Sequence, residues 1–149
     1  MSTGLSMKED EKIVNVVLDT NILISSLFWK GNPHKIVELA VNKKIQVYIS
    51  PKILTELEKV LKRDFKAQQE FIEQQTALIL EYAKIVRPIN KITIIKTDPD
   101  DNKILECALT AQANYILTYD KKHLLILKNF QGILIITPEQ FLKILEQQK

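Results

Sequence analysis

Residues 14–21 run Val14-Asn15-Val16-Val17-Leu18-Asp19-Thr20-Asn21, so that an apolar run ends in three polar side chains. The run is dense in β-branched residues, which favours a strand buried on both faces. Strands of this kind belong to parallel sheets whose two faces are covered by helices. The segment therefore predicts an α/β fold, with polar residues at the carboxyl end of a strand.

The rest of the chain alternates short β-branched runs with longer helical patterns. Strands are predicted at 14–18, 45–49, 92–95, 115–118 and 133–136. Helices are predicted at 22–28, 34–42, 51–62, 65–84, 101–112 and 121–127, with a last helix after the capping box at 137–140. This alternation predicts a three-layer α/β/α fold, in which a mostly parallel central sheet has helices on both faces.

Length and composition fit one globular domain. The 149 residues are 46% hydrophobic and 26% charged, with a net charge of +3, which excludes wholesale disorder. No apolar run exceeds four residues, so we expect no membrane-spanning segment and no membrane partner. Residues 1–12 are polar and lack the apolar core of a signal peptide, so we expect a flexible tail before a single domain at 13–149. The lone Cys107 favours a reducing, cytoplasmic location.

Two of the predicted strands are followed by aspartates. Asp19 follows the first strand, and Asp120 follows the strand at 115–118. The functional crevice of such a sheet lies outside the carboxyl ends of its strands, so both carboxylates are expected at this same rim of the sheet. A plainer interpretation stays open, in which each aspartate only caps the helix that follows it.

A third acid, Asp101, is placed by helical periodicity. It lies three and four residues before Ile104 and Leu105, on the apolar stripe of its helix, whereas Glu106 is expected to point away from that stripe. A carboxylate on the buried side of a helix is costly unless something positive is bound beside it. Asp101 is therefore a candidate ligand for a cation.

The helix predicted at 51–62 offers two glutamates. Glu56 and Glu58 lie on opposite borders of the apolar stripe of this helix. Periodicity alone does not choose between them.

Four segments, in order, resemble the motifs of the PIN-domain family. They are VLDTNIL at 17–23, SPKILTEL at 50–57, DNKILECA at 101–108 and ILTYD at 116–120, and the likeness spans residues 14 to 136. The acids that match the family's pattern are Asp19, Glu56, Asp101 and Asp120. The chain is most similar to the bacterial and archaeal PIN proteins classed as toxin components of toxin–antitoxin pairs, relatives of VapC-like toxins.

The resemblance implies a divalent-metal-dependent endoribonuclease that hydrolyses phosphodiester bonds of single-stranded or structured RNA. Asp19 and Asp101 would be the principal ligands of Mg²⁺ or Mn²⁺, and Asp120 would hold the same ion, directly or through water, or a second ion. Glu56 would orient or deprotonate the attacking water. Oxygen ligands without a Cys or His cluster suit these hard cations better than zinc.

Other residues would support the acids or bind the substrate. The resemblance implies Asn21 and Thr118 as polar supports that fix carboxylates and waters. Lys121 and Lys122 directly follow Asp120 and are the best candidates for phosphate contacts. Pairs of basic residues on helices are more often simply solvated, which is the plainer interpretation of this pair.

The resemblance also implies partners, namely an RNA substrate, a small antitoxin protein and a second copy in a homodimer. The alternative function is a catalytically silent PIN-like module that binds RNA or a protein. A binding module has no reason to keep four mutually repelling acids, which speaks against this alternative. A phosphatase of the haloacid-dehalogenase type does not fit, because Asn21 stands where that chemistry needs a second aspartate.

Overall fold

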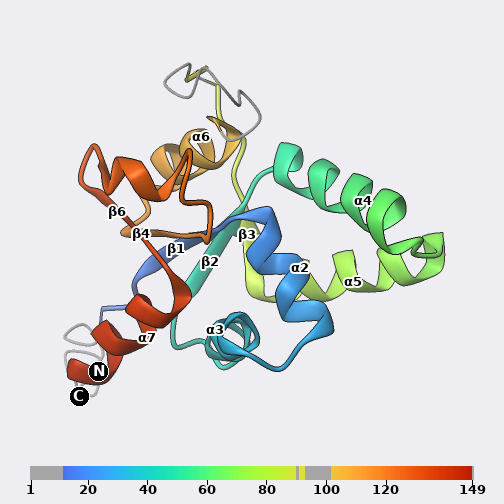
Figure 1. The fold of residues 1–149 in the computed structure, drawn as a ribbon, viewed down its shortest axis with the longest axis horizontal. Coiled ribbons are helices and arrows are strands. Elements are labelled where there is room, and N and C mark those ends of the chain that lie inside the picture. The colour runs from blue at the N-terminus through green and yellow to red at the C-terminus, as the bar shows by residue number, and fades with distance from the viewer. Residues whose placement is uncertain (1–11, 90, 93–101, 149) are drawn as a thin grey trace, which may run out of the picture.

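The computed structural model describes residues 12–89, 91–92 and 102–148. Within these ranges six strands form one sheet in the order β3-β2-β1-β4-β6-β5 (Figure 1). The strands are β1 (Asn15–Leu18), β2 (Gln46–Ile49), β3 (Ala83–Ile85), β4 (Tyr115–Leu117), β5 (Asn129–Phe130) and β6 (Ile133–Ile136). Every neighbouring pair is parallel except β5 with β6, so the predicted mostly parallel sheet is confirmed.

Helices cover both faces of the sheet. They are α2 (Thr20–Phe28), α3 (Asn32–Val41), α4 (Pro51–Phe65), α5 (Gln69–Tyr82), α6 (Asn102–Ala111) and α7 (Pro138–Gln147), with a short 3₁₀ turn η2 (Leu125–Leu127). Figure 1 shows α6 on one side of the strands and α3 with α7 on the other. The expected three-layer α/β/α arrangement is therefore present. None of the described helices is both long enough and apolar enough to cross a membrane.

The centre of the sheet is the centre of the core. Strand β1 pairs with β2 on one side and with β4 on the other, and Val16 and Val17 are 0% exposed. Full burial of one such side chain stabilises the fold by roughly 1.5–3 kcal/mol. The apolar run of β1 therefore holds the middle of the sheet and fixes where its polar continuation emerges.

Two helix starts follow the capping chemistry predicted from sequence. The Ile53 N–H donates to Ser50 Oγ at 3.3 Å at the start of α4. At the start of α7, the Gln140 N–H donates to Thr137 Oγ1 at 3.2 Å, while the Thr137 N–H donates to Gln140 Oε1 at 2.9 Å. The reciprocal pair is a capping box, and it satisfies two N–H groups that a helix start otherwise leaves free.

Some predicted elements differ from the structure. The helix expected at 65–84 ends at Tyr82, because Ala83–Ile85 pairs in parallel with β2 as strand β3. The helix expected at 121–127 is reduced to turns and η2, and the short strand β5 was not expected. In the predicted strand at 92–95, Ile92 is not in a strand and the rest lies outside the described residues.

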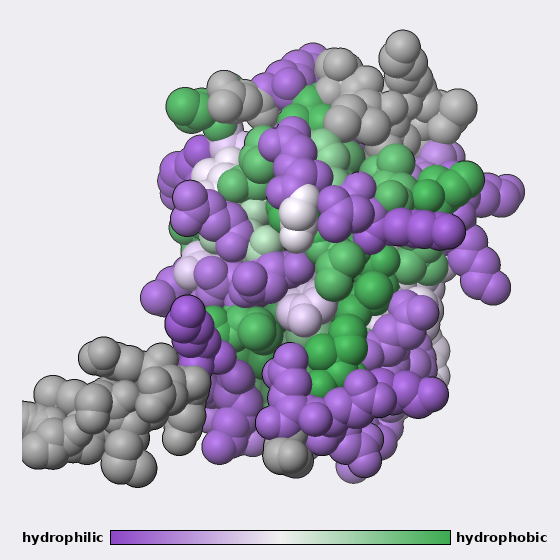
Figure 2. Space-filling view, turned by 90° about the vertical axis from the view of Figure 1, so that its left-hand side faces the viewer, coloured by the Kyte–Doolittle hydropathy of each residue, from purple (hydrophilic) through white to green (hydrophobic). Residues whose placement is uncertain are grey.

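The edge of the sheet at β5 and β6 is short, and its surface carries both hydrophobic and hydrophilic side chains. Strand β5 has two residues and runs antiparallel to β6. Figure 2 shows this side of the molecule, where hydrophobic side chains surface among hydrophilic ones. Ile126 and Leu134 are among the exposed hydrophobic residues of the chain. A two-residue edge strand offers few free backbone groups for pairing with another chain.

Candidate active site at the carboxyl ends of the strands

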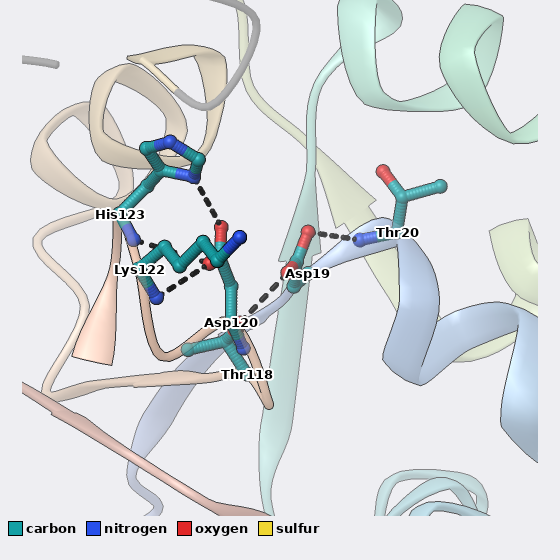
Figure 3. A network of polar contacts seen from close by, with 6 residues as sticks. All are labelled: Asp19, Thr20, Thr118, Asp120, Lys122 and His123. Carbon is teal, nitrogen blue, oxygen red and sulfur yellow. Dashed lines mark hydrogen bonds and ion pairs between the residues drawn. The ribbon is translucent and has the colours of Figure 1, made fainter. Parts of the chain in front are cut away.

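The first two predicted acids are brought together by strand pairing. β1 and β4 are parallel neighbours with Leu18 opposite Leu117, so the residues that follow them emerge side by side. Thr118 Oγ1 donates to Asp19 Oδ2 at 2.7 Å and accepts from the Asp120 N–H at 3.0 Å (Figure 3). One threonine hydroxyl therefore connects the carboxylate of Asp19 to the backbone of Asp120.

Asp19 is a buried carboxylate. It is 6% exposed, and its Oδ1 accepts from the Thr20 N–H at 2.7 Å at the start of α2. Burial raises the pKa of the Asp19 carboxyl above its ordinary value, and the negative charge of Asp120 adds to the rise. The hydrogen bonds from Thr118 and Thr20 and the positive charge of Lys103 oppose it. The site is therefore a place where negative charge is costly without a compensating cation.

Asp120 organises the turn that follows β4. Its Oδ1 accepts from the N–H groups of Lys122 and His123, each at 3.1 Å, and its Oδ2 lies 3.4 Å from His123 Nδ1. These are capping contacts, like the one Asp19 makes with Thr20. Each aspartate uses one carboxylate oxygen for capping, and its second oxygen contacts another side chain. Capping therefore does not exclude a functional role of the two aspartates at the rim of the sheet.

The residue between Thr118 and Asp120 ties this turn to two helix starts. Tyr119 Oη donates to Glu139 Oε2 at 2.5 Å, in the first turn of α7. Asn32 Nδ2, at the start of α3, donates to the same oxygen at 2.9 Å. These hydrogen bonds lower the pKa of the Glu139 carboxyl, against the opposing effect of desolvation. The chain segment that carries Asp120 is thereby fixed by the hydrogen bond from Tyr119 to Glu139 of α7, as well as by the hydrogen bond to Thr118.

The structure separates the two glutamates that periodicity left open. Glu58 pairs with Lys62 at 3.3 Å on the exposed side of α4. Glu56 faces α6, where its Oε1 lies 4.0 Å from Lys103 Nζ, and the two side chains are 25% and 13% exposed. Lys103 also lies near enough to Asp19 to lower its pKa. Sequence reasoning did not single out Lys103, although it stands two residues after Asp101 in a quoted motif.

The expectation that Glu106 points away from the buried side of its helix is wrong. Glu106 is 6% exposed, and its Oε2 accepts from the Ile92 N–H at 2.9 Å. Its Oε1 lies 3.8 Å from Lys52 Nζ. Helix α6 is covered on the Glu106 side by the segment at Ile92 and by the start of α4, which helical periodicity does not reveal.

The other predicted site residues that the structure describes make few contacts with Asp19 and Asp120. Asn21 is exposed in the first turn of α2, and no hydrogen bond joins its side chain to either aspartate within the described residues. Lys121 and Lys122 are exposed, and Lys122 meets Asp120 through its main-chain N–H. Asp101 lies outside the described residues.

The polar groups around Asp19 bear on whether the site suits the expected cation. In the described part of the chain, no three His, Cys, Asp or Glu side chains are close enough to hold a metal ion. Beside Asp19, however, the buried Thr20 Oγ1 has no hydrogen-bond partner among these residues. An unsatisfied buried hydroxyl next to a desolvated carboxylate fits a site that takes up water or a hydrated hard cation.

Comparison with known proteins settles the family. The sequence profile of the PIN domain matches residues 15–122, from β1 through the turn after β4. The chain belongs to the PIN-domain family. A relative, the uncharacterized protein MJ1680 of Methanocaldococcus jannaschii, is 34% identical over 122 aligned residues, which cover 77% of each chain.

Solved structures share the fold of this PIN-domain protein. VapBC2 from Rickettsia felis, crystallised with a DNA fragment from its promoter, aligns with a TM-score of 0.58 at 19% identity, covering 81% of this chain and 96% of the other. PAE2754 from Pyrobaculum aerophilum aligns with a TM-score of 0.61 at 12% identity, covering 91% of each chain. At these identities the likeness concerns the fold.

Proposed function

We propose that this PIN-domain protein is a divalent-metal-dependent endoribonuclease that hydrolyses phosphodiester bonds of single-stranded or structured RNA. The family supports the general class, because PIN domains are generally nucleases. The observation that carries the proposal is the pairing of Asp19 and Asp120 through the Thr118 hydroxyl at the rim. Two carboxylates on neighbouring parallel strands are a costly arrangement unless they serve a cation.

Asp19, Asp120 and Asp101 would hold Mg²⁺ or Mn²⁺. Asp19 supplies a desolvated carboxylate, Asp120 supplies a second one nearby, and Asp101 joins them on the strength of its motif. Such a cation, when bound, binds a phosphate oxygen, lowers the pKa of a water and stabilises the leaving oxygen. Thr118 orients the Asp19 carboxylate by donating to one of its oxygens.

Glu56 would orient or deprotonate the attacking water. It projects from the second turn of α4 towards Lys103, with a quarter of its side chain exposed. A carboxylate held by a cation on one side keeps its second oxygen available as an acceptor for water. Lys121 and Lys122, exposed on the turn after Asp120, would contact substrate phosphates.

The biological setting we propose is the toxin of a toxin–antitoxin pair in the cytoplasm, with a small antitoxin protein as partner and a homodimer as the functional unit. The resemblance of four motifs to VapC-like proteins supports it, as does the shared fold with VapBC2. The alternative is a catalytically silent PIN-like module that binds RNA or a protein.

The test is cleavage of end-labelled RNA by the purified full chain with Mn²⁺, with Mg²⁺ and with EDTA. We expect cleavage with either metal and none with EDTA. Glu56→Gln should lower the rate at least tenfold, whereas Glu58→Gln, on the same helix and with the same change of charge, should cleave like the wild type. RNA binding without cleavage under every metal condition would instead establish the silent module.

A further inference from the structure

We propose that a cationic groove beside Glu56 binds the RNA backbone next to the cleaved phosphodiester. The groove is formed by Lys52 and Lys59 of α4, Lys103 of α6 and Arg87, which follows β3. The proposal rests on the proposed nuclease function and adds to it the place where the substrate's neighbouring phosphates lie.

Two adjoining cavities make up this cationic groove. One, of about 330 Å³, is lined by Pro51, Lys52, Thr55, Glu56, Lys59 and Lys103. The other, of about 190 Å³, is lined by Ser50, Pro51, Lys52, Arg87, Pro88 and Glu106. They share Pro51 and Lys52, so one continuous depression runs over the start of α4 and includes the proposed water-positioning residue Glu56.

The charges of the cationic groove favour a polyanion. Glu106 lies 3.8 Å from Lys52, and Glu56 lies 4.0 Å from Lys103, so each acid faces one lysine at the long end of ion-pair distance. Within the described residues, Lys59 and Arg87 take part in no ion pair. The groove therefore keeps at least two cations for a ligand, and a phosphodiester is the anion that the proposed substrate supplies repeatedly.

Helical geometry aligns the groove with the site. Lys52, Glu56 and Lys59 are spaced by four and three residues, so they share one face of α4. Lys52 to Lys59 spans about 10 Å along the helix at 1.5 Å per residue. A backbone lying along this face would pass Glu56 on its way to the aspartates. Lys62 lines neither cavity and pairs with Glu58 instead.

Single-stranded RNA fits this arrangement of charges better than a rigid duplex. The cations of the groove come from three separate segments of the chain. A flexible strand bends to meet such dispersed charges, and a positively charged groove that tracks the backbone is a common mode of single-strand binding. The groove recognises phosphate, so we expect little dependence on base sequence.

The experiment measures binding of a fluorescein-labelled single-stranded RNA oligonucleotide to the full chain in EDTA, so that binding is observed without cleavage. The variants are Lys59→Ala, Arg87→Ala and, as matched control, Lys62→Ala. All three side chains are exposed, and thermal melting checks that each variant is folded. We expect Lys59→Ala and Arg87→Ala to weaken binding about 3- to 10-fold and to reduce the salt slope of log K by about 0.7 each. Lys62→Ala should change neither quantity.

A second measurement tests contact with a particular phosphate. Oligonucleotides carrying one neutral methylphosphonate linkage, moved along the strand, should reveal a position that weakens wild-type binding. The same linkage should have no effect on Lys59→Ala, because the contact is already lost. If both variants bind like the wild type, or if every linkage weakens the wild type and Lys59→Ala equally, the groove proposal is wrong.

The outcomes separate this proposal from the proposed function. Wild-type cleavage together with unchanged binding by the variants overturns the groove and leaves the nuclease intact. Loss of binding in the variants, with no cleavage by the wild type in Mn²⁺, supports the groove and overturns the nuclease. An absence of RNA binding by the wild type overturns the groove outright.

Discussion

Lys103 Nζ lies 4.0 Å from Glu56 Oε1, across the space between α6 and α4. Burial raises the pKa of the Asp19 carboxyl, and the same ammonium group partly opposes this rise, so one lysine faces acids from two different motifs. An acid cluster that awaits a cation is destabilised by mutual repulsion, and an internal positive charge reduces that cost. The lysine and the proposed metal ion would therefore act on the same negative charges.

Lys103→Gln should make the metal-free protein less stable and the metal-bound protein easier to form. Loss of the charge leaves Glu56 and Asp19 less compensated, which should lower the free energy of unfolding in EDTA by about 1 kcal/mol. The melting temperature should then rise at a lower Mn²⁺ concentration than in the wild type. Lys62→Gln, which removes an exposed lysine that does not line the cavity beside Glu56, is the control. An unchanged Mn²⁺ midpoint would contradict the counter-ion role.

Thr118→Val should disturb both aspartates while keeping the shape of the side chain. The substitution removes the donor to Asp19 Oδ2 and the acceptor for the Asp120 N–H. Leaving these buried groups unsatisfied should cost about 1–3 kcal/mol in urea unfolding and should lower RNA cleavage. Thr118→Ser keeps the hydroxyl and should restore most of both. Equal behaviour of the two variants would show that the hydroxyl is unimportant.

Asp19→Asn should change how stability depends on pH. The raised pKa means that, above the ordinary value near 3.8, the folded protein binds more protons at this group than the unfolded chain does. The contribution of Asp19 to stability therefore falls as pH rises through this window. In EDTA, the unfolding free energy of the wild type relative to Asp19→Asn should decrease from the acid side towards neutrality and then level off.

Asp64→Asn supplies a control of opposite sign. The hydrogen bond from Arg63 lowers the pKa of the Asp64 carboxyl, so its contribution is present above the ordinary value and is lost as pH falls. Parallel pH curves for the wild type and Asp19→Asn would show that the burial of Asp19 does not affect its titration.

Asp101→Asn should abolish cleavage of single-stranded RNA without lowering the stability of the metal-free fold. Asparagine keeps the shape of the side chain and removes one negative charge, which the proposed site would place beside Asp19 and Asp120. The wild type should gain stability from Mn²⁺, by about 2.7 kcal/mol at a metal concentration of 100 times Kd, and the variant should lose most of this gain. Cleavage at the wild-type rate would exclude Asp101 as a ligand.

The protein should self-associate at micromolar concentration. Leu78 and Leu80 on α5 are 53% and 40% exposed, which leaves apolar surface to bury. Light scattering should give twice the 17.2 kDa of one chain. Leu78→Lys should shift the mass towards the monomer. A monomer at every concentration tested would end the expectation of a homodimer.

The sequence predicts the centre of this molecule better than its periphery. Strands β1, β2, β4 and β6 were predictable because each is a short segment dominated by apolar residues. The aspartates after β1 and β4 could be assigned to one rim from topology alone. Strand β3 was not, because its three residues continue a helical pattern and become a strand only by pairing with β2.

The surroundings of the site depend on contacts that periodicity cannot represent. Glu106 is buried because distant segments cover it, and Lys103 gains its importance from Glu56, which lies on another helix. Glu56 could be distinguished from Glu58 only through a resemblance to known motifs, or through the position of Lys103. Long-range partners of this kind are set by tertiary packing rather than by local sequence.

The order of synthesis gives the link between Asp19 and Thr118 another meaning. The two residues are separated by 99 positions, and Glu139, which accepts a hydrogen bond from Tyr119, comes 20 positions after that tyrosine. At about 5–20 residues per second, a ribosome needs roughly 5–20 s to reach Thr118 after Asp19 has been made. The aspartate pair cannot assemble on a nascent chain until Thr118 has been synthesised. The proposed nuclease would therefore stay harmless to the messenger that encodes it until the ribosome has passed this residue.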